Sequence, residues 1–143
     1  MVKVFIDTNV LIDLLVPSRK GYNGATELFT LVFDGNIEAA ISTQSILDAI
    51  YTGQKYPEVD MTSLRTKLEN LTLKTNIGQV NSFDVRSALR NPNPDIEDSA
   101  HISFAYDQVC DFFITNDQKL LNRKLPSPLK AMTPEQFVNC CKA

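Results

Sequence analysis

Hydrophobic residues occur along this chain in two patterns, short continuous runs and helical repeats. Residues 2–6 and 112–114 form nearly continuous apolar runs, which are typical of strands buried on both faces. Residues 37–41, 77–80 and 129–132 are predicted as further strands. Elsewhere, apolar residues recur every three or four positions, as at Val10, Leu11, Leu14 and Leu15. This spacing predicts helices there and over residues 24–33, 45–52, 61–73, 82–89 and 95–106, a short helix or turn over 119–122, and a last helix from Thr133.

The alternation of strands and helices predicts an α/β fold with a mostly parallel central sheet. Polar punctuation separates the elements, most clearly at Asp34-Gly35-Asn36 and Asn91-Pro92-Asn93-Pro94. Ser82 is expected to cap the helix that follows it, with Asp84 in the first turn. We find no repeat, low-complexity tract or linker, so we expect one domain over residues 1–143.

Composition indicates an ordinary globular protein expected in the cytoplasm. The chain has 143 residues, of which 43% are hydrophobic and 22% are charged. Its three cysteines, Cys110, Cys140 and Cys141, lack zinc-site spacing and are expected to be reduced thiols. The charge of Asp7, after the first apolar stretch, comes too early for the hydrophobic region of a signal peptide. No apolar run approaches the roughly 20 residues of a membrane-spanning helix, so no membrane association is expected.

The formal net charge of −3 differs from the basic excess of most nucleic-acid-binding proteins. The C-terminal third is nevertheless locally basic, with Lys119, Arg123, Lys124 and Lys130. These side chains are open to two interpretations, a local contact surface for nucleic acid or an ordinary solvated face.

Two aspartates directly follow predicted strands. Asp7 comes after the first strand, and Asp117 lies just past the strand at residues 112–114. Ligands bind beyond the carboxyl ends of parallel strands, so both aspartates are expected at the edge of the sheet where a site would lie. Each alone is equally explained as a helix cap.

More acids are expected at the same edge. Asp95, Glu97 and Asp98 open one predicted helix, and Asp95 and Asp98 share a face because they are three residues apart. Asp48 lies early in the helix that follows the second strand. The joint placement of these acids favours a site over a set of independent caps and surface residues.

Clustered carboxylates repel one another unless a cation is present, and Mg²⁺ and Mn²⁺ prefer oxygen ligands. Such a cation can activate water and neutralise charge on a phosphate, so the pattern suits hydrolysis of a phosphodiester bond. No Ser-His-Asp arrangement or Gly-rich phosphate loop is evident. The single histidine, His101, falls in the middle of a helix and is expected to be packed or solvated.

Four segments, in this order and spacing, resemble the PIN-domain family. They are VFIDTNVLID at residues 4–13, STQSILD at 42–48, DIEDSA at 95–100 with Ala105, and FFITND at 112–117. The segment MTPEQF at 132–137 is similar to the family's closing segment. The resemblance therefore spans nearly the whole chain.

The resemblance implies a Rossmann-like three-layer α/β/α sandwich and a ribonuclease that depends on Mg²⁺ or Mn²⁺. By position, it implies that the catalytic, metal-binding acids are Asp7, Asp48, Asp98 and Asp117, with Asp95 as a fifth ligand, and that Thr8 or Asn9, and Thr115, orient the carboxylates. One departure is that the family usually has Glu where this chain has Asp48, which is one methylene shorter.

Many small members of the family are VapC-type toxins of bacterial toxin–antitoxin pairs, which form homodimers and are inhibited by a small antitoxin. The resemblance implies an RNA substrate, a small antitoxin partner and a homodimer here. The short acid at Asp48 and the acidic pI leave open a catalytically weakened module that binds protein or RNA. A receiver-like signalling domain fits less well, because Asp7 stands alone after the first strand.

Overall fold

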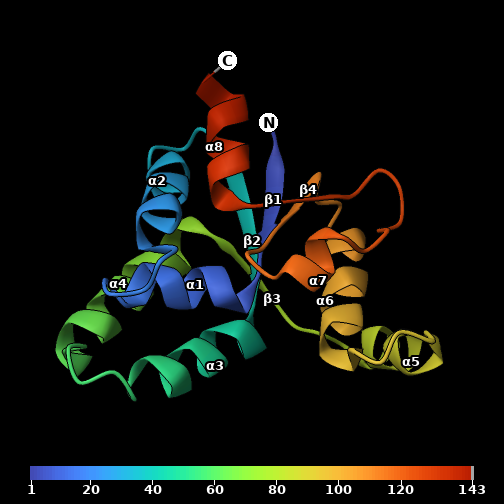
Figure 1. Ribbon diagram of the computed structural model, residues 1–143, viewed down its shortest axis with the longest axis horizontal. Coiled ribbons are helices and arrows are strands. Elements are labelled where there is room, and N and C mark those ends of the chain that lie inside the picture. Colours follow the sequence, from blue (N-terminus) through green and yellow to red (C-terminus); the bar gives the residue numbers. More distant parts are fainter. Residues whose placement is uncertain (143) are drawn as a thin grey trace.

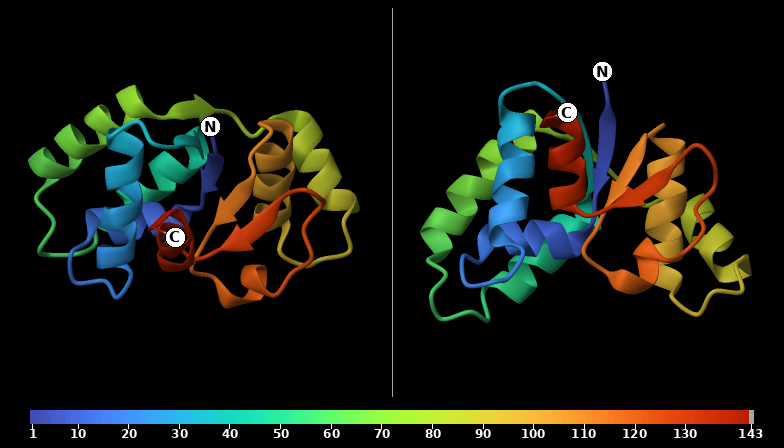
Figure 2. Two further views of the ribbon diagram at one scale, coloured as in Figure 1. Left: turned by 90° about the horizontal axis from the view of Figure 1, so that it is seen from above. Right: turned by 45° about the horizontal axis from the view of Figure 1, so that its top comes forward.

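The computed structural model describes residues 1–142 and contains a parallel five-stranded sheet between two layers of helices (Figure 1; Figure 2). In chain order the elements are β1 (Lys3–Ile6), α1 (Thr8–Leu15), α2 (Tyr22–Phe33), β2 (Glu38–Ser42), α3 (Thr43–Gly53), α4 (Met61–Lys74), β3 (Asn76–Gly78), α5 (Ser82–Arg90), α6 (Ile96–Asp107), β4 (Phe112–Ile114), α7 (Gln118–Leu121), β5 (Lys130–Met132) and α8 (Pro134–Lys142). This three-layer α/β/α architecture confirms the predicted fold class.

The strand order β3-β2-β1-β4-β5 places β1 at the centre of the sheet. The chain builds outward from β1 to β2 and β3 on one side, then returns to add β4 and β5 on the other. The strand order therefore reverses at β1, and ligands of open α/β sheets bind at such a point, outside the carboxyl ends of the strands. Asp7 follows β1 at this position.

Alternation along β1 divides its side chains between two cores, which explains its continuous apolar run. Val4 and Ile6 pack into the larger core, under α1, α2, α4 and α8. Phe5 points to the other face, where it joins Phe113 and the apolar side of α6. The two rings are neighbours because Phe5 pairs with Phe113 in the sheet register.

Polar caps begin most of the helices, and at one of them the sequence-based prediction was wrong. Helix α5 is capped by Asn81, not by Ser82. The Asn81 side chain accepts from the backbone N–H of Asp84, and the Asp84 carboxylate accepts from the backbone N–H of Asn81. This reciprocal pair satisfies two N–H groups, which Ser82 as the first helical residue does not do.

The cysteines are free thiols, with Cys110 buried and Cys140 and Cys141 exposed. Within residues 1–142, none of the helices has the length and apolar character needed to span a bilayer.

Candidate metal centre

Asp7 is a buried acid at the carboxyl edge of the sheet, with 5% of its surface exposed. It caps α1, because its Oδ1 accepts from the backbone N–H of Thr8 at 2.8 Å. Its Oδ2 accepts from the Thr115 hydroxyl at 2.8 Å and from the Asn9 side-chain amide at 3.0 Å. Burial raises the pKa of Asp7, the charge of Asp117 adds to this, and the hydrogen bonds oppose it.

Asp117 is held beside Asp7 by the same hydroxyl group. The Thr115 Oγ1 accepts from the backbone N–H of Asp117 at 3.1 Å and from the Asn9 side chain at 3.0 Å. Asp117 in turn caps the short helix α7 by accepting from the backbone N–H of Lys119 at 3.0 Å. Thr115 therefore fixes the positions of two acids on adjacent segments.

Asp95 and Asp98 reach this edge from the start of α6. Asp95 caps the helix by accepting from the backbone N–H of Asp98 at 3.1 Å. Asp95, Asp98 and Asp117 each offer a carboxylate oxygen, and these oxygens lie within 4.8 Å of one another. Burial, a hydrogen bond to Asp95 and the negative charges of the other acids raise the pKa of Asp98 to about 7.

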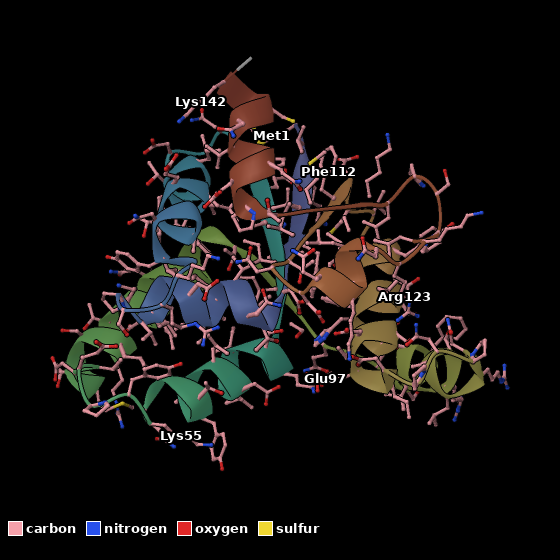
Figure 3. All side chains as sticks on the ribbon, in the orientation of Figure 1. Met1, Lys55, Glu97, Phe112, Arg123 and Lys142 are labelled. Atoms are coloured by element: carbon pink, nitrogen blue, oxygen red, sulfur yellow. The ribbon has the colours of Figure 1, made fainter. Side chains whose placement is uncertain are left out.

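Asp48, expected at the same site, lies outside this group of three. Its charge acts on Glu97, a residue that the sequence placed at the start of α6 but did not assign to the site. Burial raises the pKa of Glu97, and the charges of Asp48, Asp7 and Asp95 add to this. Figure 3 shows Glu97 at the start of α6, facing the first turns of α3. Glu97 is therefore close enough to Asp48, and to Asp7 and Asp95, for their charges to act on it.

A chain of hydrogen-bonded side chains links the helices that carry the acids. The sequence did not predict it. The His101 Nε2 lies 3.0 Å from the Ser42 Oγ, which donates to the Ser45 Oγ at 3.0 Å. Ser45 lies 2.8 Å from the Thr8 hydroxyl. Burial lowers the pKa of His101, so the ring is neutral near pH 7. The chain ties α6, α3 and α1 together beneath the acids that these helices carry, and His101 is packed, as predicted.

A second set of contacts holds the loop that carries Asp117. Asp13 is buried and accepts from the Arg19 Nε at 2.6 Å and from the Asn116 side-chain amide at 2.8 Å. The backbone N–H of Asn116 donates to the Asn9 side chain at 2.9 Å. A side chain at Gly21 would overlap the Asp13 carboxylate, since a Cβ there would lie 2.1 Å from Oδ2. These contacts fix the loop that carries Asp117.

The donor set fits a hard divalent cation. The three convergent groups are all carboxylates, which Mg²⁺ and Mn²⁺ prefer. Among residues 1–142, no basic side chain lies within 4.0 Å of these carboxylates to balance their charge. A cation would relieve the repulsion that raises the pKa of Asp98.

The chain belongs to the PIN-domain family, since the family model for the PIN domain matches residues 3–119. A search of curated proteins found no match.

Three solved structures share the fold at low sequence identity. A toxin–antitoxin complex from Klebsiella pneumoniae has a chain with 18% identity and a TM-score of 0.63, with 92% of this chain and 97% of that chain covered. VapBC2 from Rickettsia felis, solved with a DNA fragment from its promoter, has 18% identity and a TM-score of 0.60, with 92% and 98% covered. VapC20 from Mycobacterium tuberculosis, described as a toxin that cleaves the sarcin–ricin loop, has 9% identity and a TM-score of 0.61, with 77% and 86% covered.

Proposed function

We propose that this protein is a metal-dependent endoribonuclease that hydrolyses RNA phosphodiester bonds, and that residues 1–143 act as one PIN-like domain. The observation that carries the proposal is the convergence of Asp95, Asp98 and Asp117 beside the buried Asp7. We assign Mg²⁺ or Mn²⁺ to these four acids and to Asp48. A cation bound there would activate water and neutralise charge on the phosphate.

The acids supply negative charge, and the residues around them hold the carboxylates in fixed orientations. Thr115 and Asn9 hold the Asp7 carboxylate in one orientation, while the backbone N–H of Thr8 binds its other oxygen. Asp117 is aimed through the same Thr115 hydroxyl. These hydrogen bonds limit the motion of the acids, so little rearrangement is needed when a cation and a phosphate bind.

We further propose that the protein is the toxin of a bacterial toxin–antitoxin pair. The solved structures with the same fold include chains described as toxins or as parts of toxin–antitoxin complexes, and one is described as cleaving an RNA loop. In this proposal the protein works in the cytoplasm as a homodimer, inhibited by a small antitoxin. A short reading frame beside its gene, whose product binds this protein, is the corresponding observation to seek.

The test of the nuclease proposal is cleavage of structured RNAs by purified protein with Mn²⁺, Mg²⁺ or EDTA. We expect cleavage only with a metal, and loss of cleavage in Asp7→Asn. Asp34→Asn is the matched control, because Asp34 is exposed at the end of α2, away from the carboxyl edge of the sheet. Cleavage that persists in EDTA, or full activity in Asp7→Asn, would refute the mechanism.

A second candidate function is a PIN-like module that binds protein or RNA without catalysis. It is favoured by the position of Asp48, which is short for its role and lies outside the three convergent acids. Calorimetry with Mn²⁺ separates the two functions. Absence of metal binding in a protein with a normal melting transition would favour the binding module.

A further inference from the structure

A cleft of about 800 Å³ lies beside the acidic group, on the face of the sheet covered by α5 and α6. Its walls are α5, α6 and the segment that follows α7. Ser99, in its lining, is the next residue after Asp98. Asn93, also in the lining, accepts through its side chain from the backbone N–H of Asp95 at 2.9 Å. The cleft therefore begins directly beside two of the three convergent acids.

Arg123 stands at the boundary between the cleft and the acids. Its Nη2 donates to the Ser99 hydroxyl at 2.7 Å, and Figure 3 shows it on the same flank of the sheet as α6 and α7. In the part of the chain that the structure describes, no carboxylate lies within 4.0 Å of this half-buried guanidinium. A guanidinium has five N–H donors, so most of them are available to an anion. Lys124 adds a second, exposed cation to the lining.

Two aromatic rings line the cleft from opposite helices. Phe83 on α5 is 62% exposed, and Tyr106 on α6 is 49% exposed. Neither belongs to the buried hydrophobic clusters on the two faces of the sheet. Exposed rings next to cations are the elements with which proteins bind single-stranded nucleic acids, because bases stack on the rings and phosphates bind the cations.

We propose that this cleft binds the stretch of single-stranded RNA that adjoins the scissile phosphate. One or two bases stack on Phe83 and Tyr106, and the phosphates nearest the acids bind Arg123 and Lys124. The proposal rests on the nuclease function proposed above. RNA fits the lining better than a protein segment does, because the two cations lie next to acids that would act on a phosphate. Asp107, the acid in the lining, lies at the end of α6, away from the convergent acids at its start.

The experiment is a titration of the full chain with a short, fluorescein-labelled single-stranded RNA in EDTA, followed by fluorescence anisotropy at several salt concentrations. EDTA removes the metal, so binding is measured without cleavage. We expect Phe83→Ala and Tyr106→Ala each to raise Kd about five-fold or more, with no change in the salt dependence. Arg123→Gln and Lys124→Gln should each reduce the slope of log K against log salt by about 0.7.

The matched controls are Phe33→Ala and Lys74→Gln, which line a separate hollow near the start of β3, at the opposite edge of the sheet. Both should keep the wild-type Kd and salt slope. All four cleft positions are at least partly exposed, and melting curves should remain within a few degrees of wild type.

Two outcomes separate this proposal from the nuclease function. If the wild-type protein cleaves RNA with Mn²⁺ but the four cleft variants keep its Kd and salt slope, the cleft proposal is overturned and the nuclease stands. If the wild-type protein never cleaves, the nuclease function fails, while reduced binding by the variants still supports RNA in the cleft. Unchanged RNA binding together with lost binding of a protein partner would assign the cleft to that partner instead.

Discussion

Replacing Asp98 by asparagine should stabilise the metal-free protein while removing its response to metal. The raised pKa of Asp98, about 7 against an ordinary value of 3.8, means that its ionised form is disfavoured in the folded state. The difference corresponds to about 4 kcal/mol if taken in full, at 1.36 kcal/mol per pKa unit. Because Asp98 is half-buried and solvent screens its charge, we expect an effect of about 1–2 kcal/mol.

The dependence of this stability difference on pH follows from the raised pKa of Asp98. Below pH 3.8 the carboxyl is protonated in both the folded and the unfolded chain, so it has no influence on stability. As pH rises from 3.8 to about 7, the unfolded chain loses its proton first and the folded protein is progressively destabilised. The advantage of Asp98→Asn should therefore be small near pH 4 and complete above pH 7.

Thermal unfolding in EDTA at several pH values measures this advantage, and each ~1 kcal/mol should move Tm by roughly 3–5 °C. With Mn²⁺ at about 100 times its Kd, the wild-type protein should gain ~2.7 kcal/mol and Asp98→Asn much less. Asp34→Asn serves again as the control and should follow the wild type. An Asp98→Asn protein that is less stable than wild type in EDTA above pH 7, or that keeps the full Mn²⁺ response, would refute the reasoning.

Three other substitutions test two supports of the site and one of its acids. Thr115→Val removes the hydroxyl group that hydrogen-bonds to both Asp7 and Asp117. It should lower the free energy of unfolding, measured by urea denaturation, by ~2–3 kcal/mol. It should also lower the Mn²⁺ affinity, measured by calorimetry, by about 10- to 100-fold. His101→Ala should cost ~2–4 kcal/mol in the same denaturation assay, because it leaves a cavity beside Phe5 and removes the partner of a buried hydroxyl. Asp48→Glu should raise Mn²⁺ affinity and cleavage rate several-fold, because the added methylene extends the acid towards the site; a fall in both would show that the shorter acid is the better fit.

Local patterns in the sequence predicted the fold because each pattern reflects burial of the element that carries it. The run before Asp7 is continuous because Val4 and Phe5 face different cores. The cap of α5 was assigned one residue late, since Asn81 and Ser82 are both good caps and only the reciprocal contact with Asp84 decides between them.

The supports of the site could not be predicted in this way. Ser42 and His101 are 59 residues apart, and their contact depends on how α6 packs against the start of α3. Arg123 contacts Ser99 from 24 residues further along the chain, and this contact depends on how α7 and the segment after it lie against α6. Such pairs leave no periodic signal, so the sequence indicated Ser42 only as part of a segment that resembles the family and Arg123 only as one of several basic residues.

Helix capping and metal binding, which the sequence presented as rival roles for the same acids, are compatible in this structure. A carboxylate has two oxygens and about four acceptor positions. Asp95 and Asp117 each use one oxygen to cap a helix, which leaves the other oxygen for a cation. Asp7 instead accepts three hydrogen bonds through both oxygens, which fits its place outside the group of three acids. Since an asparagine can keep the capping bond while losing the charge, asparagine variants at Asp95 and Asp117 separate the contribution of these acids to folding from their contribution to metal binding.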